Sequence, residues 1–563
     1  LEKSDPLSQI GILERLPALR LEGWEKAVVK RLSDTEKSVR VAAIGALKGS
    51  KDTDALDAIV KVVDADGDPD VKSAAAAALS ASTNPKYSAY GLYFAIRGSD
   101  EAAALAALDE LARLGKTDAA AEIVAALAHQ SRSVGARAAS TLRALGLDAE
   151  LAKGLRNSQL DPAVRLQIAI EMSSSKDKDL SFSGLAFLAL NAPAEQAIRA
   201  LSALKGYKDP EPLDAVVAAL TSPHPEVRVA AAQALVSLKE EDALPALAKA
   251  WRESLEVQPQ LEKAMVELLL ASEKLSDLED RIGKDKDELL RRCDYQALAQ
   301  KAADAGRFAA VREVLVTGLD DKSELARGGA ILALSKQADE ETLVLLAAKA
   351  KDASALVRTD VAVALRAFPV ARGTDVLLEL AKDSEPSVAV AAIDTLAARA
   401  ESAVLRDLVK MSRPSDVRVR TALLRAASAM YTDETRTDAV AYISNALFDD
   451  DRTVKLAAIA ALGGLNDAQA VGSLALFMQD PDPEYKSAAL RALGTGQHPD
   501  AIPLISQAVA SGELRTRLVA IEAALLHGSI KFVPEFKMML IDEQDPQVKG
   551  ALEAAVLKLE SQD

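Results

Sequence analysis

The stretch Asp451–Val471 reads DRTVKLAAIAALGGLNDAQAV, and the stretch Asp482–Ile502 reads DPEYKSAALRALGTGQHPDAI. Both begin with an acidic turn and continue with one phrase: Val or Tyr, then Lys, then a run rich in Ala and Leu. Apolar residues fall at offsets 0, 3, 4, 7 and 8 from the first residue of the phrase, which is one face of an α-helix. The phrase therefore predicts a recurring helix, with small alanines where neighbouring helices press together.

The phrase recurs along the whole chain, mostly at intervals near 30–32 residues, a spacing typical of helical solenoids. A second apolar helical pattern precedes each copy, as in Asp54–Val63 and Thr374–Ala381. Turns with Asp and Pro separate the two patterns, and these residues suit a helix cap and a first turn. No stretch alternates with period two, so we expect roughly 17 helix pairs and no sheet. Copies begin at Val39, Val71, Val134, Val164, Val227, Val257, Ala326, Val357, Val388, Val419, Val454, Tyr485, Thr516 and Val548.

The repeated unit Asp-Pro-x-Val-Arg-x-Ala-Ala-x-x-Ala-Leu resembles the HEAT repeat, especially the short bacterial form named from phycobilisome lyases. The segments Asp66–Ser80, Asp161–Ile170 and Pro225–Leu238 carry this resemblance. It covers nearly the whole chain and is weakest around residues 272–320. It implies an all-α fold, a right-handed α-α superhelix in which the phrase-bearing helices line the concave side. A fold of this kind does not determine function.

A charged segment interrupts the repeat between Ser272 and Asp294, where more than half of the residues are charged. Charge runs are usually solvated faces, which favours a solvated helix or an extended loop between helices. The alternative is a hinge or an inserted docking surface. We therefore expect an N-terminal repeat array over residues 1–270, an irregular charged helical segment over 271–320, and a C-terminal array over 321–563.

A basic residue follows the first position of most copies, and two interpretations compete. The cations could pair with aspartates of the turns in an internal ladder, in which an exposed pair adds at most about 1 kcal/mol. They could instead line a concave groove that holds an acidic partner or phosphate. The recurring aspartates and the negative net charge favour the ladder. The cations are Arg40, Lys72, Arg165, Arg228, Arg327, Arg358, Arg420, Lys455, Lys486, Arg517 and Lys549, and the aspartates include Asp352, Asp383, Asp416, Asp449 and Asp480.

The sequence contains little that points to chemistry. Its single cysteine, Cys293, excludes an intrachain disulfide and a cysteine-rich metal site. The histidines His129, His224, His498 and His527 lie far apart and lack partners at helical metal-ligand spacing. We therefore predict no catalytic residue, no metal and no cofactor, and a protein that is not an enzyme.

The formal charge of −16 and the 3% content of aromatic residues bear on the partner. A nucleic-acid binder needs a basic face to neutralise phosphates, so the acidic balance disfavours one. An acidic groove favours a basic protein partner by steering its approach. The leading hypothesis is a non-enzymatic scaffold or adaptor that binds partner proteins, or takes part in a larger complex, along an extended helical surface.

Two alternatives remain from the resemblance. A bilin lyase-like or other enzyme-associated role is one, although no nucleophile or bilin-binding residue can be assigned. A HEAT-like nucleic-acid-binding protein is the other, disfavoured by charge and by the few aromatics.

The compartment is less defined by the sequence. No apolar run approaches 18 residues, so we predict no membrane span. The single thiol, Cys293, fits a reducing compartment, which favours the cytoplasm. The scarcity of cysteine and the first residue, Leu1 in place of Met, leave an exported or periplasmic protein as the alternative.

Overall fold

Repeated helix pairs make up the structure, a computed structural model in which residues 5–19, 21–208, 212–411, 414–511 and 513–561 are described. These residues form 35 α-helices, seven short 3-10 helices and no strand. The 34 helices from α2 to α35 form 17 successive pairs, with α1 before them. The predicted all-α fold of roughly 17 helix pairs is confirmed.

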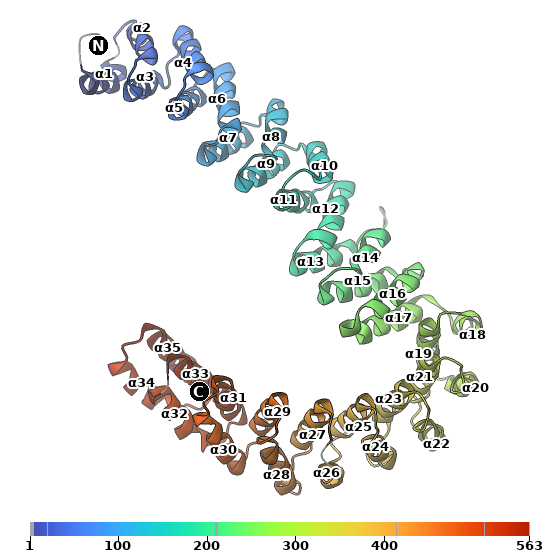
Figure 1. Cartoon of the computed structure of the whole chain (residues 1–563). Coiled ribbons are helices and arrows are strands. Elements are labelled where there is room, and N and C mark those ends of the chain that lie inside the picture. The colour runs from blue at the N-terminus through green and yellow to red at the C-terminus, as the bar shows by residue number, and fades with distance from the viewer. Residues whose placement is uncertain (1–4, 20, 209–211, 412–413, 512, 562–563) are drawn as a thin grey trace. The chain divides into compact units, whose positions relative to one another are not determined.

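The chain divides into two compact units, Leu1–Ala271 and Ser272–Asp563. Within each unit the odd-numbered helices pack against one another in one row, beside a row of even-numbered helices (Figure 1). The phrase identified in the sequence lies on odd-numbered helices.

In the first unit the odd-numbered row consists of α1 (Pro6–Leu19), α3 (Lys37–Leu47), α5 (Pro69–Ser80), α7 (Glu101–Arg113), α9 (Arg132–Ala144), α11 (Pro162–Ser173), α13 (Ala194–Leu204), α15 (Pro225–Leu238) and α17 (Gln258–Ser272). The even-numbered row consists of α2 (Trp24–Val29), α4 (Thr53–Ala65), α6 (Pro85–Arg97), α8 (Ala120–Ala126), α10 (Asp148–Arg156), α12 (Lys178–Asn191), α14 (Leu213–Ala219) and α16 (Leu244–Glu253).

In the second unit the odd-numbered row consists of α19 (Glu288–Asp304), α21 (Glu324–Leu334), α23 (Ala355–Ala364), α25 (Pro386–Ala398), α27 (Val417–Ala429), α29 (Arg452–Gly463), α31 (Pro483–Gly496), α33 (Leu514–His527) and α35 (Pro546–Glu560). The even-numbered helices are α18 (Leu275–Lys284), α20 (Phe308–Gly318), α22 (Glu340–Lys349), α24 (Thr374–Leu380), α26 (Leu405–Val409), α28 (Arg436–Ala446), α30 (Ala468–Ala475), α32 (Ala501–Ser511) and α34 (Phe532–Asp542). The 3-10 helices of the two units are η1 (Lys30–Ser33), η2 (Thr117–Ala119), η3 (Glu241–Ala243), η4 (Leu255–Val257), η5 (Leu365–Ala367), η6 (Ser402–Val404) and η7 (Leu476–Gln479).

Aspartate caps explain where many of these helices begin. Asp451, for example, accepts hydrogen bonds from the N–H groups of Thr453 at 2.8 Å and Val454 at 3.3 Å. Such caps satisfy donors that have no partner inside the helix. Proline then occupies the first turn of several odd-numbered helices, among them α5, α11 and α31, where its missing N–H costs nothing.

Small residues allow the odd-numbered helices to approach closely. A Cβ added at Gly463 of α29 would lie 2.7 Å from the Cα of Ala492 in α31. The phrase residues Val454, Ile459 and Leu462 are buried beside this contact. Each helix pair is therefore sheltered by the next pair in the chain, as the repeat pattern requires.

The charged segment differs from the expectation of a solvated helix or loop. The helix α18 exposes most of its residues, but α19 buries Arg292 and Asp294 together with apolar neighbours. The expectation is wrong for α19 because its charges have partners inside the protein. Arg292 forms two hydrogen bonds to the carboxylate of Asp360 in α23, at 2.6 and 3.0 Å. The hinge alternative stays a prediction.

Gly328 makes room for this ion pair. It lies in α21, between α19 and α23, and a Cβ there would meet Asp360 Oδ2 at 1.9 Å and Arg292 Nη1 at 2.4 Å. Both charged side chains are only 7% exposed. A glycine is therefore required where the pair passes α21.

Replacement of Gly328 by Ala should displace the buried pair. Since breaking a buried ion pair is strongly destabilising, we expect the free energy of unfolding to fall by about 3 kcal/mol. Urea denaturation followed by circular dichroism measures this change. In the control, Gly550→Ala in α35, the added Cβ meets nothing within 4 Å, and better helix propensity should raise stability by up to about 1 kcal/mol. Similar losses in both variants would contradict the role of Gly328.

Candidate functional site

Arg327 in α21 links the turns that precede two consecutive odd-numbered helices. Its Nε and Nη2 each donate to the carboxylate of Asp352 at 3.0 Å. Its Nη1 donates to the main-chain oxygen of Asp321 at 2.9 Å. The guanidinium thus binds a main-chain carbonyl of the turn before α21 and a carboxylate of the turn before α23.

The same contacts repeat on either side of Arg327. One repeat earlier, Arg291 Nη2 donates to the carboxylate of Asp321 at 3.1 Å. One repeat later, Arg358 donates to the main-chain oxygen of Asp352 at 2.9 Å and to the carboxylate of Asp383 at 2.7 and 2.9 Å. We call an arginine of one repeat, together with the acidic side chain that it binds before the next odd-numbered helix, a rung, and we call all such rungs the arginine ladder.

The ladder affects the ionisation of its acids. The hydrogen bonds from Arg358 hold the pKa of Asp383 below its ordinary value, against the opposing effect of burial. The N–H of Glu385 also donates to the Asp383 carboxylate, at 2.9 Å. Asp383 therefore stays ionised at neutral pH and joins two repeats.

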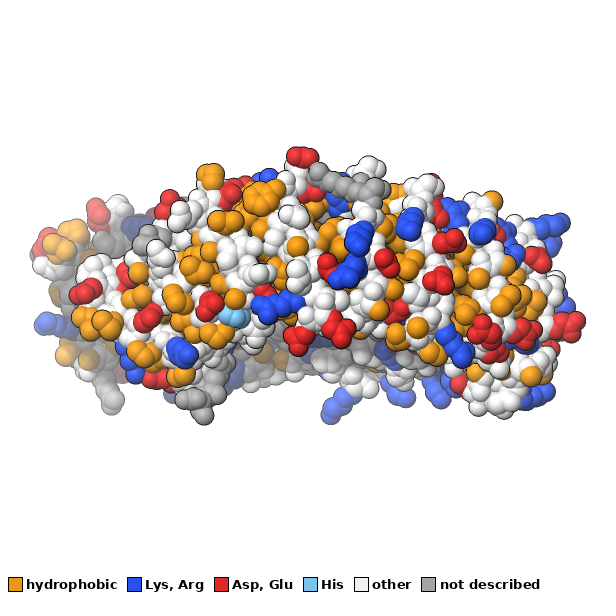
Figure 2. All heavy atoms as spheres, turned by 90° about the horizontal axis from the view of Figure 1, so that it is seen from below, with side chains coloured by type: hydrophobic (Ala, Val, Ile, Leu, Met, Phe, Trp, Pro, Cys, Tyr) orange, Lys and Arg blue, Asp and Glu red, His pale blue; other side chains and the backbone are white. Residues whose placement is uncertain are grey.

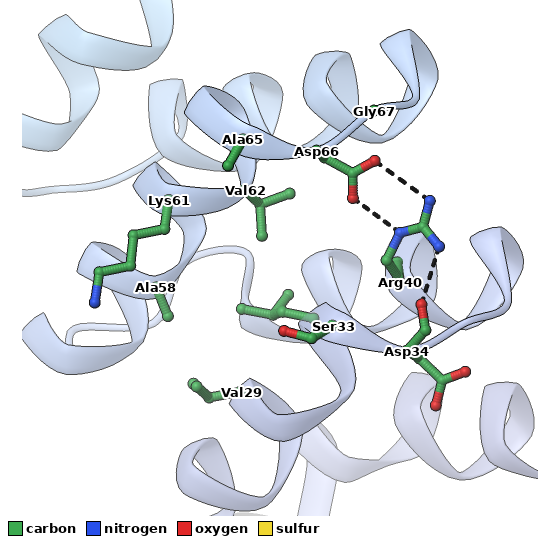
Figure 3. A pocket seen from close by; sticks show the side chains of 11 residues that line it. Val29, Ser33, Asp34, Arg40, Ala58, Lys61, Val62, Ala65, Asp66 and Gly67 are labelled. Atoms are coloured by element: carbon green, nitrogen blue, oxygen red, sulfur yellow. Dashed lines mark hydrogen bonds and ion pairs between the residues drawn. The ribbon is translucent and has the colours of Figure 1, made fainter.

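A separate copy of this contact lies in the first unit. Arg40 donates to the carboxylate of Asp66 at 2.9 and 3.3 Å and to the main-chain oxygen of Asp34 at 2.9 Å (Figure 3). The same figure shows Lys61 on the other side of the pocket, away from this pair. The pocket is thus lined by an exposed cation on one side and by an ion pair that is already satisfied on the other.

Three further cations predicted from the sequence pair with an acidic side chain that precedes the next odd-numbered helix. These pairs are Arg228 with Glu256, Arg420 with Asp449 and Arg517 with Glu543.

The other predicted cations make different contacts. Lys72 Nζ donates to the main-chain oxygen of Asp64 at 3.2 Å. Arg165 donates to the main-chain oxygen of Leu155 at 3.1 Å and stacks on the ring of Phe187, 4.8 Å from its centroid.

The remaining lysines form no ion pair with any residue that the structure describes. Lys455 lies 5.8 Å from the centroid of the Tyr485 ring, and Lys486 and Lys549 have no recorded acidic partner. The eleven cations therefore do not form one uninterrupted series.

The predicted turn aspartates also differ in their partners. Asp416, expected to join a ladder, instead binds Arg418 two residues away, at 3.0 Å. Asp480 accepts the N–H of Asp482 at 2.8 Å. A cation and an aspartate that recur in the sequence are thus not always brought together in space.

Sequence reasoning missed Arg291, which begins the ladder. The interval from Arg291 to Arg327 is 36 residues, longer than the usual spacing, and the charged segment hides the phrase. The signal that could have found it is the pair Leu290-Arg291, which matches the first two positions of the phrase.

Asp294 is the most perturbed acid near the start of the second unit. Its side chain is fully buried, and Arg281 Nε donates to its Oδ1 at 2.9 Å. Burial raises the pKa of Asp294 to about 6, although the bond from Arg281 acts in the opposite direction. Glu273 and Asp285, which also face Arg281, raise it slightly further.

The predicted histidines and cysteine lie in structural positions. His129 Nε2 lies 2.8 Å from the main-chain oxygen of Gly98, and His527 Nε2 lies 3.1 Å from that of His498. Cys293 is buried. Within the described ranges, no group of three His, Cys, Asp or Glu residues is placed to hold a metal ion. The helices of those ranges likewise include none with the length and apolar character needed to cross a membrane.

The odd-numbered helices present a recurring exposed position, six residues after the first residue of the phrase. We call these residues the exposed column. They do not include the ladder cations. Its exposed members are Gly45, Ala77, Ile170, Gln233, Lys263, Val363, Arg425, Ala460, Arg491, Glu522 and Ala554.

The exposed column mixes apolar and charged side chains. Ile170 is 38% exposed and Val363 is 44% exposed. Arg491 and Glu522 pair across consecutive odd-numbered helices, 3.2 Å apart. The column therefore offers apolar contacts beside partly neutralised charges.

Charges are also mixed on the face drawn in Figure 2. Acidic and basic side chains there are interspersed with hydrophobic ones and do not separate by sign. Exposed apolar residues on the even-numbered row include Val344 of α22, which is 63% exposed.

Comparison with known proteins finds a family-model match in three regions of the chain. Residues 25–90, 185–265 and 472–556 match the model of HEAT repeats. This match does not single out the phycobilisome-lyase form. No curated protein matches the sequence.

Several solved structures are similar to this chain. The Escherichia coli protein YibA is 18% identical, with 46% of this chain and 96% of that chain covered and a TM-score of 0.31. Kap121p bound to Nup53p is 12% identical, with 99% and 72% covered and a TM-score of 0.40. The Kap95:Nup1 complex gives 12% identity, 99% and 92% coverage and a TM-score of 0.41.

Replacement of Arg358 by Ala should weaken the link between two repeats. It removes charge-assisted bonds and leaves Asp383 without its cation, so we expect unfolding to require about 2 kcal/mol less free energy. The control is Arg199→Ala, which breaks a pair whose side chains are 75% and 78% exposed. That change should cost less than about 0.5 kcal/mol. Urea titrations of both variants measure the difference, and equal losses would contradict the ladder.

The raised pKa of Asp294 predicts a pH dependence of stability. Because the folded chain binds this proton more tightly than the unfolded chain, its contribution to the free energy of unfolding falls as pH rises from about 4 to about 6. The total fall is on the order of 3 kcal/mol.

The variant Asp294→Asn should lack this component when urea midpoints are measured from pH 4 to pH 8. Asp280→Asn is the control, because Asp280 lies in the neighbouring α18 with its side chain 72% exposed. Parallel curves for wild type and Asp294→Asn would show that Asp294 does not titrate in this range.

Proposed function

We propose that this HEAT-repeat chain is a non-enzymatic scaffold that binds partner proteins along its odd-numbered helices. The observation that carries the proposal is the exposed column. It recurs on eleven helices of the odd-numbered row, while the ladder arginines are occupied by bonds within the protein. A surface built this way offers many similar contacts over a long distance and no single reactive centre.

The composition of the exposed column suits an extended or helical protein segment. Ile170 and Val363 supply apolar contacts, which give affinity when they are removed from water. Charged members such as Arg425 and Glu522 supply specificity through the arrangement of their charges. The formal charge of −16 favours a partner that is basic overall.

The alternatives receive no specific support from the described residues. A bilin lyase-like activity needs a reactive or pigment-binding group, and the recurrent arginines bind acids of the chain instead. A nucleic-acid-binding role needs a row of cations free to face phosphates. Seven ladder cations, Arg40, Arg228, Arg291, Arg327, Arg358, Arg420 and Arg517, already contact acids of the chain.

Introduction of positive charge into the apolar part of the exposed column tests the proposal. The double variant Ile170→Arg, Val363→Arg should lose a partner protein that the wild-type full chain captures from a lysate of its source. We expect the captured amount to fall by about tenfold, since a buried unpaired charge costs several kcal/mol. Quantitative mass spectrometry measures the loss.

The matched control carries the same charges on the even-numbered row, as Leu190→Arg, Val344→Arg. These residues are 48% and 63% exposed. The control should retain the partner, and thermal melting should be equal in both variants. Capture that survives the column variant, or is lost equally in both, would refute binding along the odd-numbered helices.

A further inference from the structure

The arginine ladder has a gap at α25. This helix carries Ala389 at the position that Arg358 occupies in α23 and Arg420 occupies in α27. The acidic acceptor of the next turn is missing as well, because Pro414 stands where Asp449 stands one repeat later. Both halves of one rung are therefore absent.

A pocket of about 440 Å³ lies at this gap. Ala389, itself only 1% exposed, lines it together with the turn before α25 and the turn before α27. The lining includes Asp383, Ser384, Pro414 and Ser415. We call it the gap pocket, and it occupies the place of the absent arginine side chain.

The neighbouring repeat shows which group binds at the equivalent position. Arg358 Nη1 donates to the main-chain oxygens of Asp352 at 2.9 Å and Ala353 at 3.2 Å. The corresponding oxygens at the gap belong to Asp383 and Ser384, and neither accepts a hydrogen bond from any described residue. Among the described residues, these two oxygens therefore have no donor, although a guanidinium satisfies their equivalents in the neighbouring repeat.

The far side of the gap repeats the pattern. Arg420 Nη1 donates to the main-chain oxygens of Pro414 at 2.9 Å and Ser415 at 2.7 Å. Guanidinium groups therefore occupy this position in the repeats before and after α25. By comparison with these repeats, a planar cationic group that donates hydrogen bonds is the ligand that suits the gap pocket.

We propose that the gap pocket binds an arginine side chain of a basic partner protein. The proposal rests on the scaffold function above and names the chemistry of its partner. Arginine fits better than lysine because its planar fork donates to two oxygens at once, whereas an ammonium is a compact and strongly hydrated charge.

Two other charged residues line the gap pocket. Asp416 already binds Arg418, and it lines the same pocket as Asp383. Lys382 is exposed to solvent. The formal charge of −16 supports the approach of a cationic segment.

A fluorescein-labelled hexa-arginine peptide is the probe, with hexa-lysine as the comparison, and fluorescence anisotropy of the full chain measures binding. We expect hexa-arginine to bind about tenfold more tightly than hexa-lysine. The variant Ala389→Arg places a guanidinium of the chain itself in the gap pocket. It should weaken binding of hexa-arginine by about tenfold and raise the melting temperature.

Ala398→Arg is the matched control, because Ala398 is an exposed residue of the same helix. It adds the same charge away from the gap pocket and should change affinity by less than about twofold. Ala389→Met fills the gap pocket without adding a charge. It should also weaken binding of hexa-arginine, because the arginine side chain then has no room in the pocket.

Three outcomes would overturn the inference: equal affinity for the two peptides, unchanged binding in both Ala389 variants, or an equal loss in Ala398→Arg. Any of these results leaves the capture experiment with the exposed-column variants intact. Failure of the gap pocket and failure of the scaffold function are therefore separate results.

Discussion

Burial of apolar side chains between successive helix pairs is the interaction on which the rest of this structure depends. A single pair cannot cover its own apolar face, so each pair gains a core only from its neighbours. In α29 the residues Val454, Ile459 and Leu462 are at most 1% exposed for this reason. Close approach also demands small residues, as the contact of Gly463 with Ala492 demonstrates. Stability is therefore distributed along each unit.

The arginine ladder follows from that burial. Arg327 and Arg358, for example, come directly after the buried residues Ala326 and Val357, so the packing of those residues directs the arginines toward the turns. The ladder then fixes the turns of neighbouring repeats relative to each other. Near the start of the second unit the buried pair of Arg292 and Asp360 spans two repeats, and Gly328 provides the space it needs. Polar contacts here refine an arrangement that apolar packing creates.

Because these arginines bind acids of the chain itself, they are not available to bind other molecules. Occupied arginines cannot also bind phosphate or an acidic partner without breaking their bonds. What is left for recognition is the exposed column, with residues such as Ile170 and Val363, and the gap beside Ala389. A departure from the repeat is thus as informative about recognition as the repeat itself.

The sequence by itself determined the helix pairs, their approximate number and their buried positions, because period and apolar offsets are local properties of the chain. The tertiary structure decided which charges meet. Asp416 binds Arg418 and not a ladder cation, Arg165 lies on Phe187, and Arg292 reaches Asp360, 68 residues away. Such contacts depend on the exact distance and tilt between neighbouring helices. Packing of small side chains determines that distance and tilt, and the spacing of residues within one repeat does not predict them.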